Sequence, residues 1–93
     1  MRGWTFLTHH AHVLLALNAD ANRTIDELAQ ITGLTSRSVM NVLRDLEDGG
    51  YLHRQRQGRN NSYLINHDGA LRHATSESHT VGELIRALGT ISH

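Results

Sequence analysis

The side chains that could do chemistry fall into two short segments of this 93-residue sequence. The first segment combines hydroxyl, arginine, thioether and amide side chains: Thr35, Ser36, Arg37, Ser38, Met40, Asn41 and Arg44. The second holds arginines and amides without any acidic residue: Arg54, Arg56, Arg59, Asn60 and Asn61. Arginine donates a planar fork of hydrogen bonds that fits phosphate or guanine, and asparagine fits the edge of adenine. Both segments therefore carry donors that a nucleic acid accepts.

The first segment belongs to a predicted helix with one polar face. Its apolar residues recur at helical spacing and predict an inward stripe of Val39, Val42, Leu43 and Leu46. Its outward face holds Ser36, Arg37, Met40, Asn41 and Arg44. A preceding helix is predicted to begin at a capping box of Thr24 and Glu27 and to end at Gly33. Two helices joined by a short turn, over about 25–49, predict a helix-turn-helix.

The second segment lies in a predicted hairpin. Residues 51–57 and 62–66 form short extended runs, and the Gly-Arg-Asn-Asn loop between them accepts positive φ angles cheaply. A hairpin over about 51–66, directly after a helix-turn-helix, is a wing. The second helix of the motif would then enter the major groove of duplex DNA, and the hairpin arginines would reach phosphates or the minor groove.

Two further helices are predicted to flank this unit. The first, about 5–17, has apolar residues at helical spacing, and the last, about 80–89, opens with a capping box of Thr80 and Glu83. Residues 67–79 are polar and predicted to be mostly loop. Because a short helix is unstable alone, the last helix must dock on the body or on a second copy. We expect one domain over 1–93, mainly α with a small β-hairpin: a winged helix-turn-helix with N- and C-terminal helices flanking it.

Composition narrows the function classes. The sequence has no cysteine, so it has neither a disulfide framework nor a thiolate metal site. It has no lysine, nucleophile elbow or phosphate loop, and we predict no enzymatic activity and no cofactor. The formal net charge is zero, with positive charge concentrated in the hairpin. No apolar run approaches the roughly 20 residues that span a bilayer and no signal peptide is evident, so we expect a cytoplasmic protein without membrane association.

Over residues 4–88 the sequence resembles the compact winged helix-turn-helix transcriptional regulators of the MarR-like and ArsR-like group, especially short actinobacterial-type members. The resemblance is carried by residues 3–8, 10–11, 45–46, 50–52, 54, 56–59, 61, 63, 71–73 and 80–84. It implies a sequence-specific regulator that binds double-stranded DNA. It also implies a homodimer formed through the first and last helices, a recognition helix over 36–46 and a wing over 54–63.

Two other functions stay open at this point. Eight histidines, three of them at His9, His10 and His12, could make the protein metal-responsive or pH-sensitive. Their spacing matches no four-ligand zinc motif, so we predict no metal site. The same fold also serves as a protein-protein interaction module. Such a module is expected to lose the basic helix face and the Arg-bearing hairpin, and this sequence keeps both.

Overall fold

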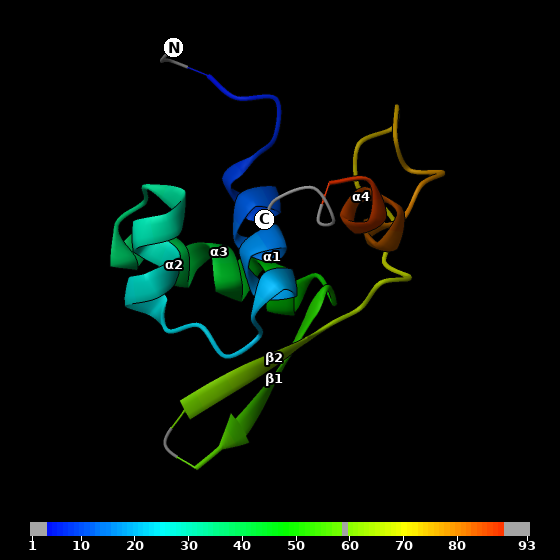
Figure 1. The fold of residues 1–93 in the computed structure, drawn as a ribbon. Coiled ribbons are helices and arrows are strands. Elements are labelled where there is room, and N and C mark those ends of the chain that lie inside the picture. The colour runs from blue at the N-terminus through cyan, green and yellow to red at the C-terminus, as the bar shows by residue number, and fades with distance from the viewer. Residues whose placement is uncertain (1–3, 59, 89–93) are drawn as a thin grey trace.

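The structure is a computed structural model that describes residues 4–58 and 60–88. Within that part, four helices surround a core and one antiparallel hairpin extends from it (Figure 1). In chain order the elements are α1 (His9–Ala19), α2 (Ile25–Thr32), α3 (Ser36–Asp48), β1 (Leu52–Gln57), β2 (Asn60–Ile65) and α4 (Val81–Leu88). The predicted class, mainly α with a small hairpin, is confirmed.

Helix α1 begins at His9, and the predicted start near residue 5 is wrong. The Thr8 hydroxyl accepts a hydrogen bond from the Ala11 amide at 3.3 Å and caps the helix there. At the other end, Arg23 Nε donates to the Ala16 carbonyl at 3.0 Å, which satisfies one of the free C-terminal carbonyls. Residues 4–7 therefore precede the helix as a separate segment.

The helix-turn-helix is set by local capping. Thr24 and Glu27 form the predicted capping box at the start of α2. Gly33 ends α2 with a φ of 78°, a conformation that favours glycine, and its amide donates to the Ala29 carbonyl. Thr35 then caps α3 by accepting from the Ser38 amide at 3.1 Å. These caps fix both ends of the turn that joins the two helices.

The core lies where α1, α2 and α3 meet. Its fully buried side chains are Val13 and Leu17 of α1, Leu28 of α2 and Val39 of α3. The hairpin and α4 add further buried residues, namely Leu52, Tyr63, Val81 and Ile85. Because α3 is packed along one side only, its opposite side is free for another role.

The hairpin is fastened at its base and projects beyond the helices (Figure 1). Its register pairs Leu52 with Ile65 at the base and Arg54 with Tyr63 two residues further out. The Tyr63 amide also donates to the Ala21 carbonyl at 3.3 Å, in the loop after α1. Apolar residues therefore hold the base to the body, and the polar outer half extends from it.

Helix α4 docks through its first turn. The Thr80 amide donates to Glu83 at 2.9 Å and the Glu83 amide donates to the Thr80 hydroxyl at 3.2 Å, which is the predicted capping box. The Gly82 amide donates to the His67 carbonyl at 2.8 Å. The segment 67–79 contains no helix or strand, only an isolated bridge between Ala70 and Thr80. Residue 89, the predicted end of the helix, lies outside the described residues.

We expect Gly82→Ala to lower the free energy of unfolding by about 1–2 kcal/mol. A Cβ atom at this position would lie 2.9 Å from the His67 carbonyl oxygen, a backbone atom that cannot swing away. The resulting strain exceeds the gain of up to about 1 kcal/mol that alanine has over glycine in a helix. Urea unfolding followed by circular dichroism measures the change. The control Ala87→Ser, at an exposed position of the same helix, should stay within about 0.5 kcal/mol of the parent, and equal stabilities would contradict the close contact.

The capping box also predicts a pH dependence. A hydrogen bond from the His79 ring, at 3.1 Å, and one from the Thr80 amide lower the pKa of Glu83 below its ordinary value of 4.5. A carboxylate with a lowered pKa stabilises the fold above that ordinary value, and the contribution is lost as the pH falls through the lower, folded-state pKa. Glu83→Gln should therefore melt below the parent at pH 7, and the gap between the two melting temperatures should narrow as the pH falls below 4.5. A gap that persists on acidification would exclude the ionised carboxylate as its cause.

Candidate nucleic-acid interface

The outward face of α3 is exposed along its length. The side chains of Ser36, Arg37, Met40, Asn41 and Arg44 all face solvent, and the opposite side of the helix carries the buried stripe Val39, Val42, Leu43 and Leu46. Arg37, Asn41 and Arg44 are spaced four and three residues apart, so they lie on one face. These three donors are free of the core, and the sequence pattern predicts this arrangement.

The three hydroxyl groups at the start of α3 already have partners within the chain. The Ser36 hydroxyl donates to the Asp26 carboxylate of α2 at 3.1 Å. The Thr35 hydroxyl donates to the Ser38 oxygen at 3.0 Å and accepts from the Ser38 amide. The Ser38 hydroxyl is an acceptor in this pair, so its own proton can point toward a ligand. A phosphate contact by Ser36 would have to displace Asp26, a residue that the sequence analysis did not include.

The hairpin arginines are also held by neighbours. Arg54 Nε lies 3.4 Å from a carboxylate oxygen of Glu47, near the end of α3. Arg56 Nε donates to the Gly58 carbonyl at 3.3 Å, so this side chain folds back over the turn. Both arginines are exposed, and their remaining N–H groups can reach solvent.

The amides of the hairpin are only partly described. Asn61 is exposed and faces Arg56 across the strands. Residue Arg59 and the side chain of Asn60, both candidates from the sequence, lie outside the described residues. The structure therefore brings Arg54, Arg56 and Asn61 onto one projecting hairpin, next to the end of α3.

Glu47 links the hairpin to α3 on both strands. It pairs with Arg54 of β1, and it is close enough to Tyr63 of β2 to affect that phenol. The pKa of Tyr63 is raised first by burial and then by the negative charge of Glu47, with Arg54 acting in the opposite direction. Tyr63 therefore stays a neutral, buried anchor of the hairpin, and Glu47 is the acidic residue of α3 whose charge acts on it.

Sequence comparison assigns this helix-turn-helix and the first part of the hairpin to a family. A sequence model of the MarR family matches residues 4–60, more than half of the chain. The chain belongs to the MarR family. MarR family regulators are DNA-binding proteins that control transcription and are not enzymes. No curated protein sequence matches this MarR family chain.

A solved structure shows the same fold. It is that of a MarR family protein of Mycobacterium tuberculosis in complex with salicylic acid. The two share 24% sequence identity with a TM-score of 0.59, over 90% of this chain and 58% of that protein. The likeness confirms the winged-helix fold. This MarR family chain spans little more than half the length of that relative.

Histidines of this MarR family chain do not gather into a metal site within the described residues. No group of three or more histidine, aspartate or glutamate side chains in that part is placed to hold a metal ion. His10 Nε2 lies 2.9 Å from Asp45 of α3, and His79 pairs with Glu83. His12 Nε2 is buried without a hydrogen-bond partner in the described residues. His10 and His12 of α1 thus have separate surroundings.

A second surface of the MarR family chain was missed by sequence reasoning. An open groove of about 1240 Å³ runs between the start of α1, the end of α3 and residues 71–84. Apolar side chains such as Leu14, Leu46 and Leu84 line it, and Asp45 and Arg72 stand among them. Three segments far apart in sequence form the groove, so no single motif indicates it.

Within residues 4–58 and 60–88, no helix is both long and apolar enough to cross a membrane.

Proposed function

We propose that this MarR family protein is a sequence-specific regulator of transcription that binds double-stranded DNA as a homodimer. The observation that carries the proposal is the exposed polar face of α3, followed directly by a projecting hairpin that bears arginines. In this arrangement α3 is the recognition helix in the major groove, and the hairpin is the wing on phosphates or in the minor groove.

Base reading is assigned to the face of α3. The major groove is about 12 Å wide and admits an α-helix, which brings side chains of one face to the base edges. Arg37 and Arg44 suit the two acceptors of guanine, and Asn41 suits the acceptor and donor of adenine. Thr35, Ser36, Ser38 and the first amides of α3 are assigned to phosphates. The Ser36–Asp26 hydrogen bond must open for that contact.

Most of the sequence-independent affinity is assigned to the wing. Arg54, Arg56, Arg59, Asn60 and Asn61 would contact the backbone or the minor groove beside the recognition helix. The 3.4 Å ion pair leaves the Arg54 side chain 55% exposed, and the Glu47 side chain is 25% exposed. An exposed pair of this kind contributes at most about 1 kcal/mol, so a phosphate can compete for the guanidinium group.

Dimerisation supplies the spacing that a DNA duplex requires. MarR family regulators usually dimerise, and two copies related by a twofold axis would place their α3 helices about one helical turn of DNA, roughly 34 Å, apart. The first and last helices are the proposed contact. The operator would then be a pseudopalindrome. A DNA-binding role also assigns the protein to the cytoplasm, and the ArsR-like and actinobacterial resemblance stays a prediction.

Selection of duplexes from a random pool, followed by fluorescence anisotropy, tests this function. The selected duplex and a scrambled one are titrated at two salt concentrations, with and without a chelator. We expect preference for the selected duplex, loss of affinity at higher salt and no effect of the chelator. Absence of any duplex binding at low salt would favour a protein-protein interaction module, and loss of binding with the chelator would favour a metal-responsive regulator.

The wing assignment predicts the behaviour of Arg56→Ala. This change removes one phosphate contact, so it should weaken binding to selected and scrambled duplexes alike and lower the slope of log K against log salt by about 1. The same titrations at several salt concentrations measure it. Arg56→Lys is the matched control, because it keeps the charge and should keep the slope. A slope that is unchanged in Arg56→Ala would remove Arg56 from the interface.

A further inference from the structure

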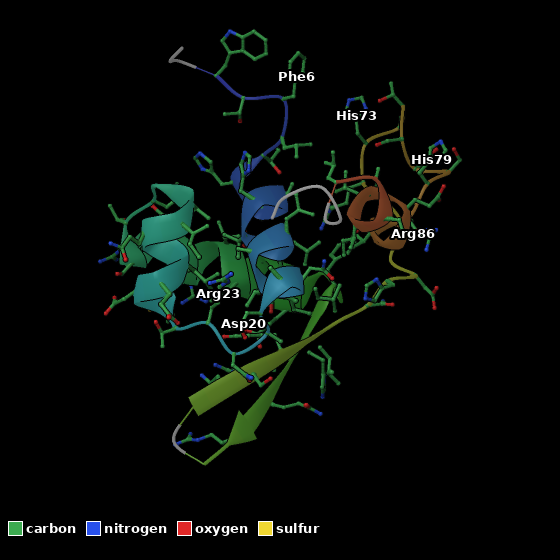
Figure 2. The ribbon with its side chains drawn as sticks, in the orientation of Figure 1. Phe6, Asp20, Arg23, His73, His79 and Arg86 are labelled. Atoms are coloured by element: carbon green, nitrogen blue, oxygen red, sulfur yellow. The ribbon has the colours of Figure 1, made fainter. Side chains whose placement is uncertain are left out.

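The segment ahead of α1 exposes two aromatic side chains. Trp4 is 64% exposed and Phe6 is 93% exposed. Their rings contact each other edge to face, with centroids 5.0 Å apart, and Figure 2 shows Phe6 on the stretch of chain that leads away from the helices. Aromatic side chains bury 150–250 Å² each when they are covered, so their exposure is costly. We call residues 4–7 the aromatic arm.

The aromatic arm lies at the edge of the groove described above, without filling it. Phe6 and Leu7 line the groove together with Leu14, Leu46 and Leu84. Ligand pockets measure about 300–1,000 Å³, and this groove of about 1240 Å³ is large enough for two aromatic side chains and the backbone that carries them. Because Phe6 borders the groove and is still 93% exposed, the arm of the same chain does not cover it.

Charges of both signs surround the apolar floor. Asp45 and Asp48 stand on the α3 side, and Asp45 already pairs with His10 of the same chain at 2.9 Å. His10 stands on α1, and Arg72 and His73 stand on the loop that leads to α4; Figure 2 shows His73 and Phe6 on the same side of the molecule. A twofold contact places a surface against its own copy, so that surface must offer both projections and hollows and both signs of charge. This face offers all of them.

We propose that the groove is occupied by the aromatic arm of a second copy of this chain, and that the two copies exchange arms reciprocally. This inference rests on the homodimer of the proposed function and specifies its contacts. Trp4 and Phe6 of one copy pack on the half-buried Leu71 and Leu84 of the other, and Asp48 on the rim of each groove meets Arg72 and His73 on the rim of its partner. The arm then lies against the end of the other copy's α3, the helix assigned to base reading.

Trp4 reports its own position, because it is the one tryptophan of the sequence. The emission spectrum of the parent protein is recorded over a dilution series and compared with sedimentation velocity on the same samples. We expect the emission maximum to move to shorter wavelength as dimer replaces monomer, with one transition concentration for both measurements. A spectrum typical of exposed tryptophan in the dimer would overturn the proposal, and so would a buried spectrum in the monomer.

Two variants separate the arm from the groove. The arm variant Trp4→Ala, Phe6→Ala keeps the groove, and the groove variant Leu84→Arg keeps the arm and its tryptophan. Each is expected to dimerise at least about 30-fold more weakly than the parent, the effect of losing one strong interface residue. Ile31→Ala, a half-exposed apolar residue of α2, is the matched control and should dimerise as the parent does. Should Leu84→Arg fail to fold, Leu71→Arg in the same groove replaces it.

Mixing the two variants tests exchange directly. The tryptophan of the groove variant has one intact groove available, on the arm variant, so its emission should shift to shorter wavelength only in the mixture. No shift in the mixture, or dimers of parent strength from the arm variant, would overturn arm exchange. Duplex titrations keep this result apart from the proposed function: a parent dimer that binds DNA while exchange fails leaves that function standing, and exchange without DNA binding contradicts the function alone.

Discussion

Asn41→Ala is expected to weaken binding to the selected duplex by about 1–3 kcal/mol, which is roughly 5- to 150-fold, and to weaken binding to a scrambled duplex far less. Asn41 is exposed in the middle of the polar face of α3, between Arg37 and Arg44. Its amide is the group there that can pair with both the acceptor and the donor of adenine. Asn41→Ala therefore removes the group that recognises adenine and leaves the charge of the protein unchanged. Anisotropy titrations on the two duplexes measure the change in their affinity ratio.

The matched control is Asn18→Ala, which removes the same amide from an exposed position of α1. Its affinity ratio should equal that of the parent. If Asn41→Ala weakens binding to both duplexes by the same factor, Asn41 contacts the DNA backbone, and other residues read the bases. If Asn41→Ala changes the affinity for neither duplex, this face of α3 does not lie in the major groove of the DNA.

Leu17→Ala is expected to lower the free energy of unfolding by about 2–5 kcal/mol. Leu17 is fully buried in α1, the helix that packs against α2, α3, α4 and β2. Its removal costs the transfer free energy of the lost methyl groups and leaves a cavity that the neighbours fill only in part. A domain of this size has about 5–15 kcal/mol of stability, so this single change removes a large share of it. Urea unfolding followed by circular dichroism measures the loss.

Leu64→Ala is the control for that change, because Leu64 is 53% exposed on the hairpin. Its stability should stay within about 0.5 kcal/mol of the parent. Similar losses in the two variants would mean that the core is not centred on α1. The hairpin and α3 would then lack the common support that keeps them side by side.

Local sequence patterns were sufficient to predict the helix-turn-helix. The capping box of Thr24 and Glu27, the glycine at position 33 and the apolar stripe of α3 act within a few residues, so the sequence predicts those helices closely. The predicted start of α1 was wrong because a local cap was overlooked. Leu7 continues the apolar spacing, but the Thr8 hydroxyl caps the first turn of α1, so the helix begins only at His9. Apolar spacing indicates which face is buried, and the cap decides where the helix begins.

The partners of the candidate residues could not be predicted. Glu47 meets Arg54, and Asp26 meets Ser36, only because folding brings separate elements together. Both contacts matter for the site, since each places a carboxylate beside a group assigned to phosphate. The groove has the same origin, because its walls come from both ends of the chain and from the end of α3. Such features depend on tertiary packing, which periodicity does not encode.

Nuclear magnetic resonance of the ¹⁵N-labelled protein, titrated with the selected duplex, tests the central claim most directly. The account predicts that amide shifts concentrate on residues 35–44 of the turn and α3 and on the outer half of the hairpin, and that residues 71–88 change little. Shifts concentrated on residues 71–88, or no shifts at duplex concentrations that saturate the anisotropy signal, would contradict it.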